Sequence, residues 1–150
     1  MYNVLMRSKK REKIINGVIH LVSGYFNLDV DVEIEVGRLK KETYAEVGQE
    51  SVGFYSIEFD KKFLTNASKE DIICVTSHEM VHVKQYEFDG LALSDDGYFY
   101  RGHKWKGDYW FSPWECEARG FEQAFLYHYL NYGKNVKKAL RPKSQKLLDN

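Results

Sequence analysis

Cysteine, net charge and long apolar runs are all scarce in this chain, and each absence removes a class of protein. Only Cys74 and Cys116 are present among 150 residues, which argues against a disulfide framework and fits a reducing compartment. The 22 basic and 22 acidic side chains leave no formal net charge, so the composition implies no polyanionic partner. We therefore expect an ordinary globular protein without a nucleic-acid partner.

Segments that could enter a membrane are also missing from the sequence. The sequence contains no run of about 18 apolar residues, which is the length needed to cross a bilayer. The basic N-terminal segment is not followed by an apolar core of about 7 to 15 residues with a cleavage site, so no secretory signal is recognised. We expect no membrane association and a cytoplasmic location.

The length suits one domain, residues 1–150, whose core can be large enough to fold without disulfide bonds or a structural metal. Basic residues gather in two clusters, at 7–13 and 134–146. These clusters could contact an acidic surface. However, few aromatic residues lie between the basic ones, and the clusters contain no recognisable nucleic-acid-binding motif. We expect residues 133–150 to form a basic C-terminal tail.

One segment indicates a specific chemistry. His78-Glu79-Met80-Val81-His82 is an HExxH pentad. Residues four apart lie on the same face of a helix, so both imidazoles can reach one zinc ion. Glu79 is the next residue after His78 around the helix, so its carboxylate can reach a water molecule bound to that ion. We therefore predict His78 and His82 as zinc ligands and Glu79 as the general base of a hydrolase.

The residues around the pentad predict the helix that it requires. Ser68 is a typical N-cap, and acidic residues follow in the first turn. Apolar residues from Ile72 to Val83 recur at spacings of three and four, and Asp89-Gly90 ends the pattern. Two ordinary histidines on an amphipathic helix remain the alternative interpretation.

The remaining patterns predict an α+β fold. Apolar spacing indicates an N-terminal helix over residues 6–24, ending before a turn at Asn27. Alternation indicates a strand over 30–36, and two more strand candidates occupy 44–48 and 53–59, joined by a polar turn at 49–51. We expect a short sheet of three or four strands, covered by the first helix.

The second half of the chain is expected to hold an irregular segment and another long helix. Residues 98–111 are rich in aromatic side chains and predict an irregular hairpin or an active-site loop. Ser112 as N-cap and Pro113 at the first helical position then indicate a helix start. From Gly133 onward we expect a short helix or a loosely held tail.

A catalytic zinc ion keeps three protein ligands and one open position, so a third donor is needed. Glu115 and Glu117 lie in the first turns of the second long helix, and His103 lies in the aromatic segment. Cys74 lies one turn before the pentad and could also be a ligand, although a cysteine at such a position is more often an inert core residue. Glu115 could instead form a capping box with Ser112.

Glu115-Cys116-Glu117-Ala118 resembles the ExxA pattern by which a second helix donates a glutamate in gluzincins, a branch of the zincin metallopeptidases. The resemblance covers chiefly residues 54–125. It implies a small zincin-like domain with a Zn²⁺ cofactor, and hydrolysis of a peptide or protein substrate, as an endopeptidase rather than an exopeptidase. The ligands that it implies are His78, His82 and Glu115.

The sequence departs from this family at Arg119, because the family commonly has an acid four residues after the ligand glutamate. That acid orients a ligand histidine by a hydrogen bond. Asp108, Glu117 or Glu122 could take its place, and the sequence does not choose among them.

Four further expectations concern the substrate and rival functions. His103 or Tyr109 could donate a hydrogen bond to the developing oxyanion, and the strand at 53–59 could be an exposed edge that binds an extended peptide. Gly102-His103-Lys104 is similar to the GH motif of SprT-like metalloproteases, which leaves a nucleic-acid-associated protease as an alternative. A non-catalytic interaction module stabilised by zinc is another, and a fourth protein ligand would reveal it.

Overall fold

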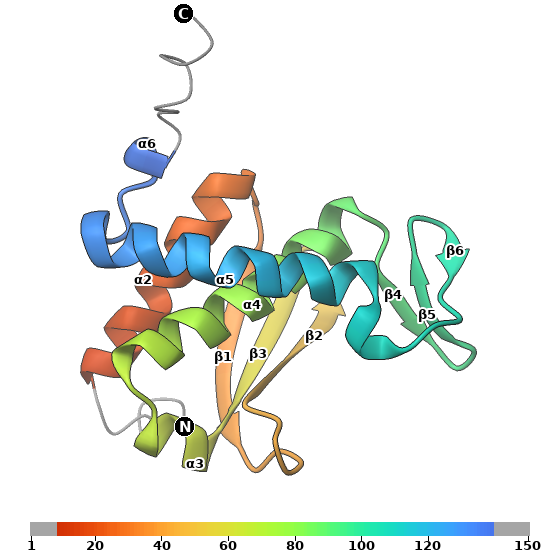
Figure 1. Cartoon of the computed structure of the whole chain (residues 1–150), viewed down its shortest axis with the longest axis horizontal. Coiled ribbons are helices and arrows are strands. Elements are labelled where there is room, and N and C mark those ends of the chain that lie inside the picture. Colours follow the sequence, from red (N-terminus) through yellow and green to blue (C-terminus); the bar gives the residue numbers. More distant parts are fainter. Residues whose placement is uncertain (1–8, 140–150) are drawn as a thin grey trace, which may run out of the picture.

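The structure is a computed structural model that describes residues 9–139, and its fold is α+β (Figure 1). The first half contains α2 (Lys9–Phe26), β1 (Asp31–Gly37), β2 (Ala45–Ser51), β3 (Phe54–Asp60) and α3 (Lys61–Asn66). The second half contains α4 (Lys69–Phe88), β4 (Ala92–Ser94), β5 (Gly97–Tyr100), β6 (His103–Lys104), the 3-10 turn η1 (Tyr109–Phe111), α5 (Pro113–Tyr132) and α6 (Val136–Ala139). The predicted fold class is confirmed.

The N-terminal helix α2 forms because one of its faces is apolar throughout. Ile15, Val18, Leu21 and Val22 are fully buried against the rest of the core. The helix runs two residues beyond the predicted end, and Asn27 then turns the chain with a left-handed φ of 56°. The predicted residues 6–8 of this helix lie outside the described part of the chain.

The first sheet has the strand order β1-β3-β2, with β1 parallel and β2 antiparallel to β3. All three predicted strands are present. The polar residues 49–51 continue β2 instead of forming the turn, which is made by Val52 and Gly53, where Gly53 adopts a φ of 73°. Such a left-handed conformation favours glycine, so the turn moves to the position where glycine stands.

The prediction that the strand at 53–59 is an exposed edge is wrong. This strand is β3, and it is hydrogen-bonded to a neighbour on each side. Its backbone groups are therefore not available to an added peptide strand. The edges of the first sheet are β1 and β2 instead.

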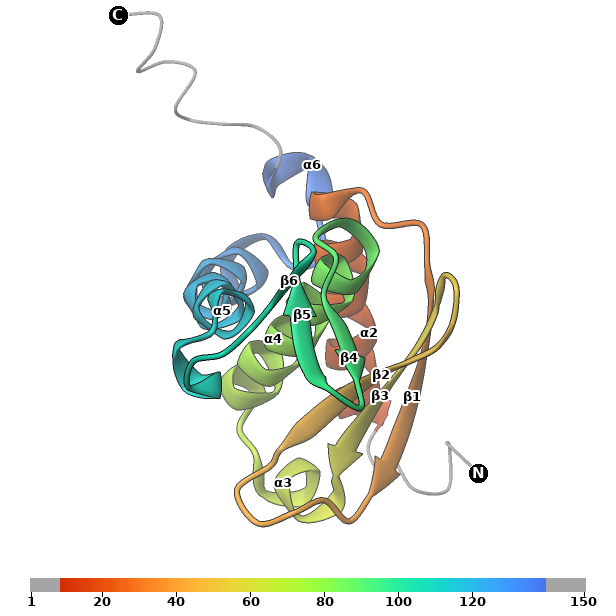
Figure 2. The ribbon, with the colours of Figure 1, turned by 90° about the vertical axis from the view of Figure 1, so that its right-hand side faces the viewer.

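The HExxH helix α4 lies between the first sheet and α5 (Figures 1 and 2). The Ser68 hydroxyl accepts a hydrogen bond from the Asp71 amide at 3.1 Å, which confirms the predicted N-cap. Because α4 has neighbours on two sides, its buried residues are not confined to one stripe, and they include Ile73, Met80 and Val81. The pentad is therefore held by packing on both sides of the helix.

Residues 92–104 form a second, antiparallel sheet in the order β4-β5-β6. The hairpin β5–β6 agrees with the prediction for the aromatic segment, whereas the short strand β4 was not predicted. The sheet is fixed by Trp114, which is 1% exposed at the start of α5. Its ring is surrounded by those of Tyr98, Tyr100, Trp105 and Tyr109, with centroids 5.3 to 6.1 Å away.

After α5, the chain turns at Gly133 and forms the short helix α6, as expected for the start of the basic tail. Residues 140–150 of that tail, and residues 7 and 8 of the N-terminal basic cluster, lie outside the described range. Within residues 9–139, no helix is both long and apolar enough to cross a bilayer.

Candidate metal centre

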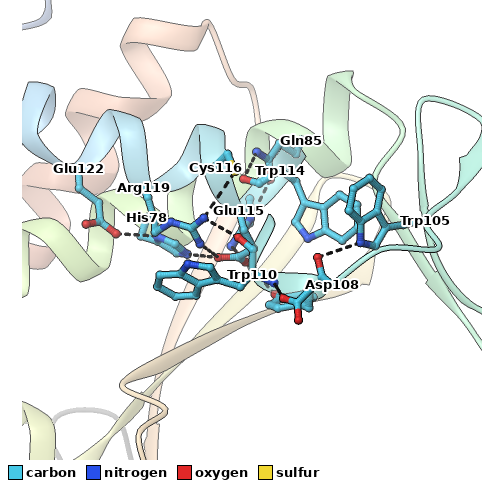
Figure 3. A network of polar contacts seen from close by, with 12 residues as sticks. His78, Gln85, Trp105, Asp108, Trp110, Trp114, Glu115, Cys116, Arg119 and Glu122 are labelled. Carbon is cyan, nitrogen blue, oxygen red and sulfur yellow. Dashed lines mark hydrogen bonds and ion pairs between the residues drawn. The ribbon is translucent and has the colours of Figure 1, made fainter. Parts of the chain in front are cut away.

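Three side chains from the two helices α4 and α5 converge on one point, and Figure 3 shows two of them, His78 and Glu115, facing each other. The rings of His78 and His82 lie one turn apart on α4, with centroids 4.7 Å from each other. Both Nε2 atoms face the Glu115 carboxylate of α5, at 3.2 Å for His78 and 2.9 Å for His82. The three donor atoms all lie within 4.8 Å of one another, so these residues could hold one metal ion.

The donor set and its spacing fit a zinc ion. Two imidazole nitrogens and a carboxylate oxygen are a usual ligand set of catalytic zinc. Bonds of about 2.0 to 2.1 Å at tetrahedral angles place neighbouring donor atoms about 3.3 Å apart. The distances from His78 Nε2 to Glu115 Oε2, 3.2 Å, and from His82 Nε2 to Glu115 Oε1, 2.9 Å, are each close to that value.

Glu115, among the third ligands considered from the sequence, is the one that the fold brings to both histidines. Glu117 instead accepts hydrogen bonds from Lys84 at 2.9 Å and from Gln85 at 3.2 Å. Cys74 is not in the group, and burial raises the pKa of its thiol, which disfavours the thiolate that a metal requires. The capping box is also absent, because Ser112 makes no side-chain cap hydrogen bond.

The ring nitrogens that face away from Glu115 are held by two further side chains. His78 Nδ1 lies 2.7 Å from Glu122 Oε1, and His82 Nδ1 lies 2.7 Å from Gln85 Oε1. Since a carboxylate and an amide oxygen can only accept, both Nδ1 atoms donate, which leaves Nε2 free to bind a metal. Glu122 is one of the three acids that the sequence offers for this role, whereas Gln85 is a partner that the sequence analysis does not name.

Glu79 follows His78 in the pentad, is buried with 7% of its surface exposed, and interacts electrostatically with both imidazoles. Burial raises the pKa of Glu79 to about 7, against the opposing effect of the imidazoles of His82 and His78. A buried carboxyl group with this pKa can both accept and return a proton near neutral pH.

The two histidines and Glu115 hold opposite charges together when no metal is bound. Burial lowers the pKa of His78, but hydrogen bonds with Glu115 and Glu122 outweigh this effect and raise it to about 10. Burial raises the pKa of Glu115, but hydrogen bonds with His78, His82 and Tyr109 outweigh this effect and hold it well below its usual range. A metal ion binding here would therefore displace protons from the imidazoles.

No protein-family model, curated protein or solved structure matches this chain. The function therefore has to be inferred from the geometry of the site itself.

Arg119, which stands where the gluzincin pattern has an acid, holds the aromatic turn η1 against α5. Its guanidinium lies 3.8 Å from the centre of the Trp110 ring and donates to the Trp110 carbonyl oxygen. Its Nη1 atom also lies 3.8 Å from Glu115 Oε2. The cation thus takes no part in orienting a histidine, and this task falls to Glu122 one turn further along α5.

The two predicted oxyanion donors have different positions. Tyr109 lies at the site, where its hydroxyl donates to Glu115 Oε1 at 2.7 Å. His103 is exposed on β6 and is not in the group of possible ligands. The preceding turn is bonded to the end of α4, with Arg101 N donating to Asp89 O at 3.1 Å. Asp89 follows His82 by seven residues, or roughly 10 Å along the helix axis.

Proposed function

We propose that this chain is a zinc-dependent metallopeptidase in which His78, His82 and Glu115 hold the ion. The observation that carries the proposal is the convergence of these three donors within 4.8 Å, with both histidines in an HExxH helix. Zinc, when bound, lowers the pKa of a coordinated water molecule and polarises a carbonyl group.

Glu79 is the proton carrier of the proposed reaction. Its carboxylate accepts a proton from the attacking water and returns it to the nitrogen of the leaving amine. Its burial on α4 keeps it near the two imidazoles and away from bulk solvent. Tyr109 donates its hydroxyl hydrogen to the oxyanion, because this group already lies within hydrogen-bond distance of the ligand Glu115.

The number of donors favours catalysis over a structural zinc site. Structural zinc sites are closed by four protein ligands, whereas catalytic sites keep one position open. In the part of the chain that the structure describes, the group contains two histidines and one glutamate and no fourth residue. This composition supports the enzyme over the zinc-stabilised interaction module.

The edge strand β2 is the proposed docking strand for an extended polypeptide. It packs against α4, and its outer backbone groups are not paired within the first sheet. Glu46 of β2 is also close enough to Glu79 to influence its pKa. A peptide that added to β2 as a further strand would therefore pass beside the proposed zinc site.

The proposal is tested with wild-type protein and Glu79→Gln, measured for zinc content and for cleavage of casein as an unstructured substrate. We expect about one zinc per chain in both proteins and cleavage by the wild type alone, because the neutral amide of the variant is unable to accept the proton. Glu70→Gln, on an exposed position of the same helix, is the matched control and should keep full activity.

Two results would contradict the proposal. Wild-type protein without stoichiometric zinc would remove the metal site, and equal cleavage by Glu79→Gln would remove Glu79 as proton carrier. Zinc content is also compared between His78→Ala and the control His20→Ala, on α2. Loss of zinc in His78→Ala alone shows that the ion is bound at this site and not at any surface histidine.

A further inference from the structure

A second concave site lies away from the metal centre, at the end of the first sheet. A cavity of about 790 Å³ opens between the β1–β2 connection, residues 38–44, and the helix α3. These two segments lie at the same end of the sheet in Figures 1 and 2. The cavity shares no lining residue with the metal centre.

The lining of this cavity is strongly cationic. Its five basic residues are Arg38, Lys40, Lys41, Lys61 and Lys62. Within residues 9–139, none of the five forms an ion pair. Lys62 is near enough to Asp60 to help lower its pKa, but positive charge still accumulates here without a close ion pair, although the chain as a whole is formally neutral.

The acidic residues of the cavity do not cancel this charge. Asp60 is engaged by the backbone, since its two carboxylate oxygens accept hydrogen bonds from Leu39 N and Phe63 N, each at 3.1 Å. Glu42 is the other acid in the lining. Five cations against two acids leave a formal charge of +3 on this cavity.

A group of acidic residues lies on a different surface, one face of the first sheet, and not at this cavity. Glu35, Glu58 and Glu46 stand opposite one another across β1, β3 and β2. Glu33 lies two residues before Glu35 and so on the same face. This separation of charge leaves the cavity with a positive local field that the zero net charge conceals.

One wall of the cavity is an aromatic pair. The rings of Tyr44 and Phe63 are stacked, with centroids 4.9 Å apart and planes inclined by 25°. Phe63 is partly buried against the core, so it supports Tyr44 from one side, while Tyr44 itself remains 54% exposed. An exposed ring held flat in this way is a platform on which a nucleobase can stack.

We infer that the cavity binds a nucleoside phosphate, either as a free nucleotide or as one unit of a single-stranded nucleic acid. Arg38 and the four lysines hold the phosphate, and Tyr44 stacks on the base. The volume lies within the range of about 300 to 1,000 Å³ that is usual for small-ligand sites. This inference does not depend on the proposed peptidase activity.

The test compares a nucleotide with the sugar phosphate that lacks its base, and with a single-stranded nucleic acid. Wild-type protein is titrated at about 50 mM salt with AMP, ribose 5-phosphate and a labelled oligo(dT) strand. We expect AMP to bind about tenfold more tightly than ribose 5-phosphate, because only AMP can stack. An oligo(dT) affinity far above that of AMP identifies a nucleic-acid strand as the ligand, and comparable affinities identify a free nucleotide.

Matched variants assign the binding to this cavity. Tyr44→Leu should reduce AMP affinity about tenfold, Tyr44→Phe should keep it, and Tyr127→Leu, on an exposed tyrosine of α5, should have no effect. Arg38→Ala with Lys61→Ala should weaken all three ligands, whereas Lys104→Ala with Lys106→Ala should not.

Three results would overturn the inference. They are no binding of AMP or oligo(dT) by the wild type, equal affinities for AMP and ribose 5-phosphate, and unchanged AMP affinity in Tyr44→Leu. The second and third would reduce the cavity to a general anion-attracting surface.

Discussion

Each imidazole of the metal centre is fixed by a hydrogen bond on the nitrogen that faces away from Glu115. The two acceptors are chemically different, since Glu122 carries a charge and Gln85 does not. A carboxylate acceptor raises the basicity of the imidazole that it holds, and with it the affinity for a metal. His78 should therefore be the stronger donor of the two.

This difference gives a prediction for Glu122→Ala. The variant should bind zinc about 10- to 100-fold more weakly, because His78 loses the partner that fixes its tautomer and orientation. The measurement is a competition titration against a chromophoric zinc chelator. Gln123→Ala, on the exposed neighbouring position, should retain the wild-type affinity. Equal zinc affinities of Glu122→Ala and the wild type would show that the hydrogen bond does not tune the site.

How far the site could be predicted depends on the distance along the chain between its residues. The pentad could be located because its residues lie close together on one helix, whereas Glu115, 33 residues further on, was implied by the resemblance of residues 115–118 to the gluzincin pattern. Gln85 follows His82 by three residues on the same helix, so that spacing could have identified it as a partner. The position of His103 could not be foreseen, because it depends on how a hairpin docks against the end of α4.

The short helix α3 depends on a single carboxylate. Asp60 accepts hydrogen bonds from Phe63 N inside the helix and from Leu39 N on the neighbouring connection. These bonds hold the pKa of Asp60 below its usual value. A carboxyl group whose pKa is lower in the folded state stabilises the protein above its unfolded pKa of about 3.9, and this stabilisation is lost as the pH falls through the folded pKa.

We therefore predict that Asp60→Asn changes the response of the protein to acid. The wild type should lose more thermal stability between pH 6 and pH 3, roughly the window around the unfolded pKa, than the variant does. Thermal unfolding at both pH values provides the measurement. Asp95→Asn, in the β4–β5 turn, is the control and should keep the wild-type difference. Identical acid responses of Asp60→Asn and wild type would refute a capping role for the charge.

The second sheet is attached to the molecule chiefly through Trp114. This ring is 1% exposed and contacts aromatic rings of β5, of the following segment and of η1. Trp114→Ala should lower the free energy of unfolding by about 3 to 5 kcal/mol, since it opens a large cavity.

Urea denaturation of Trp114→Ala and Trp110→Ala distinguishes burial from residue type. Trp110 is 60% exposed, so its removal should cost much less. A similar loss of stability in both variants would contradict the role of Trp114 as anchor.

Secondary structure was easier to predict than strand order for a physical reason. Caps and turns are chosen by neighbouring residues, as Ser68 and Gly53 illustrate. β3 is central because it pairs with β1, although β2 lies between these two strands in the sequence. No local pattern encodes that pairing. The three-residue strand β4 is too short to show a period at all.

At the scale of the whole molecule, the metal centre lies where α4 meets α5. α4 packs against the first sheet, while α5 carries the second sheet through Trp114. The contacts of His78 and His82 with Glu115 cross the boundary between these two helices. A zinc ion held by the three residues would link α4 to α5, so its binding should stabilise the entire fold.

Zinc should therefore raise the melting temperature of the wild type. A ligand that binds only the folded state at 100 times its dissociation constant adds about 2.7 kcal/mol of stability, and a chelator should remove this gain. Glu115→Ala should melt at the same temperature with and without zinc, because one ligand is missing. Glu117→Ala should keep most of the zinc response, since Glu117 is bonded to Lys84 and Gln85 and contacts neither histidine directly. A zinc response in Glu115→Ala as large as in Glu117→Ala would place the metal elsewhere in the molecule.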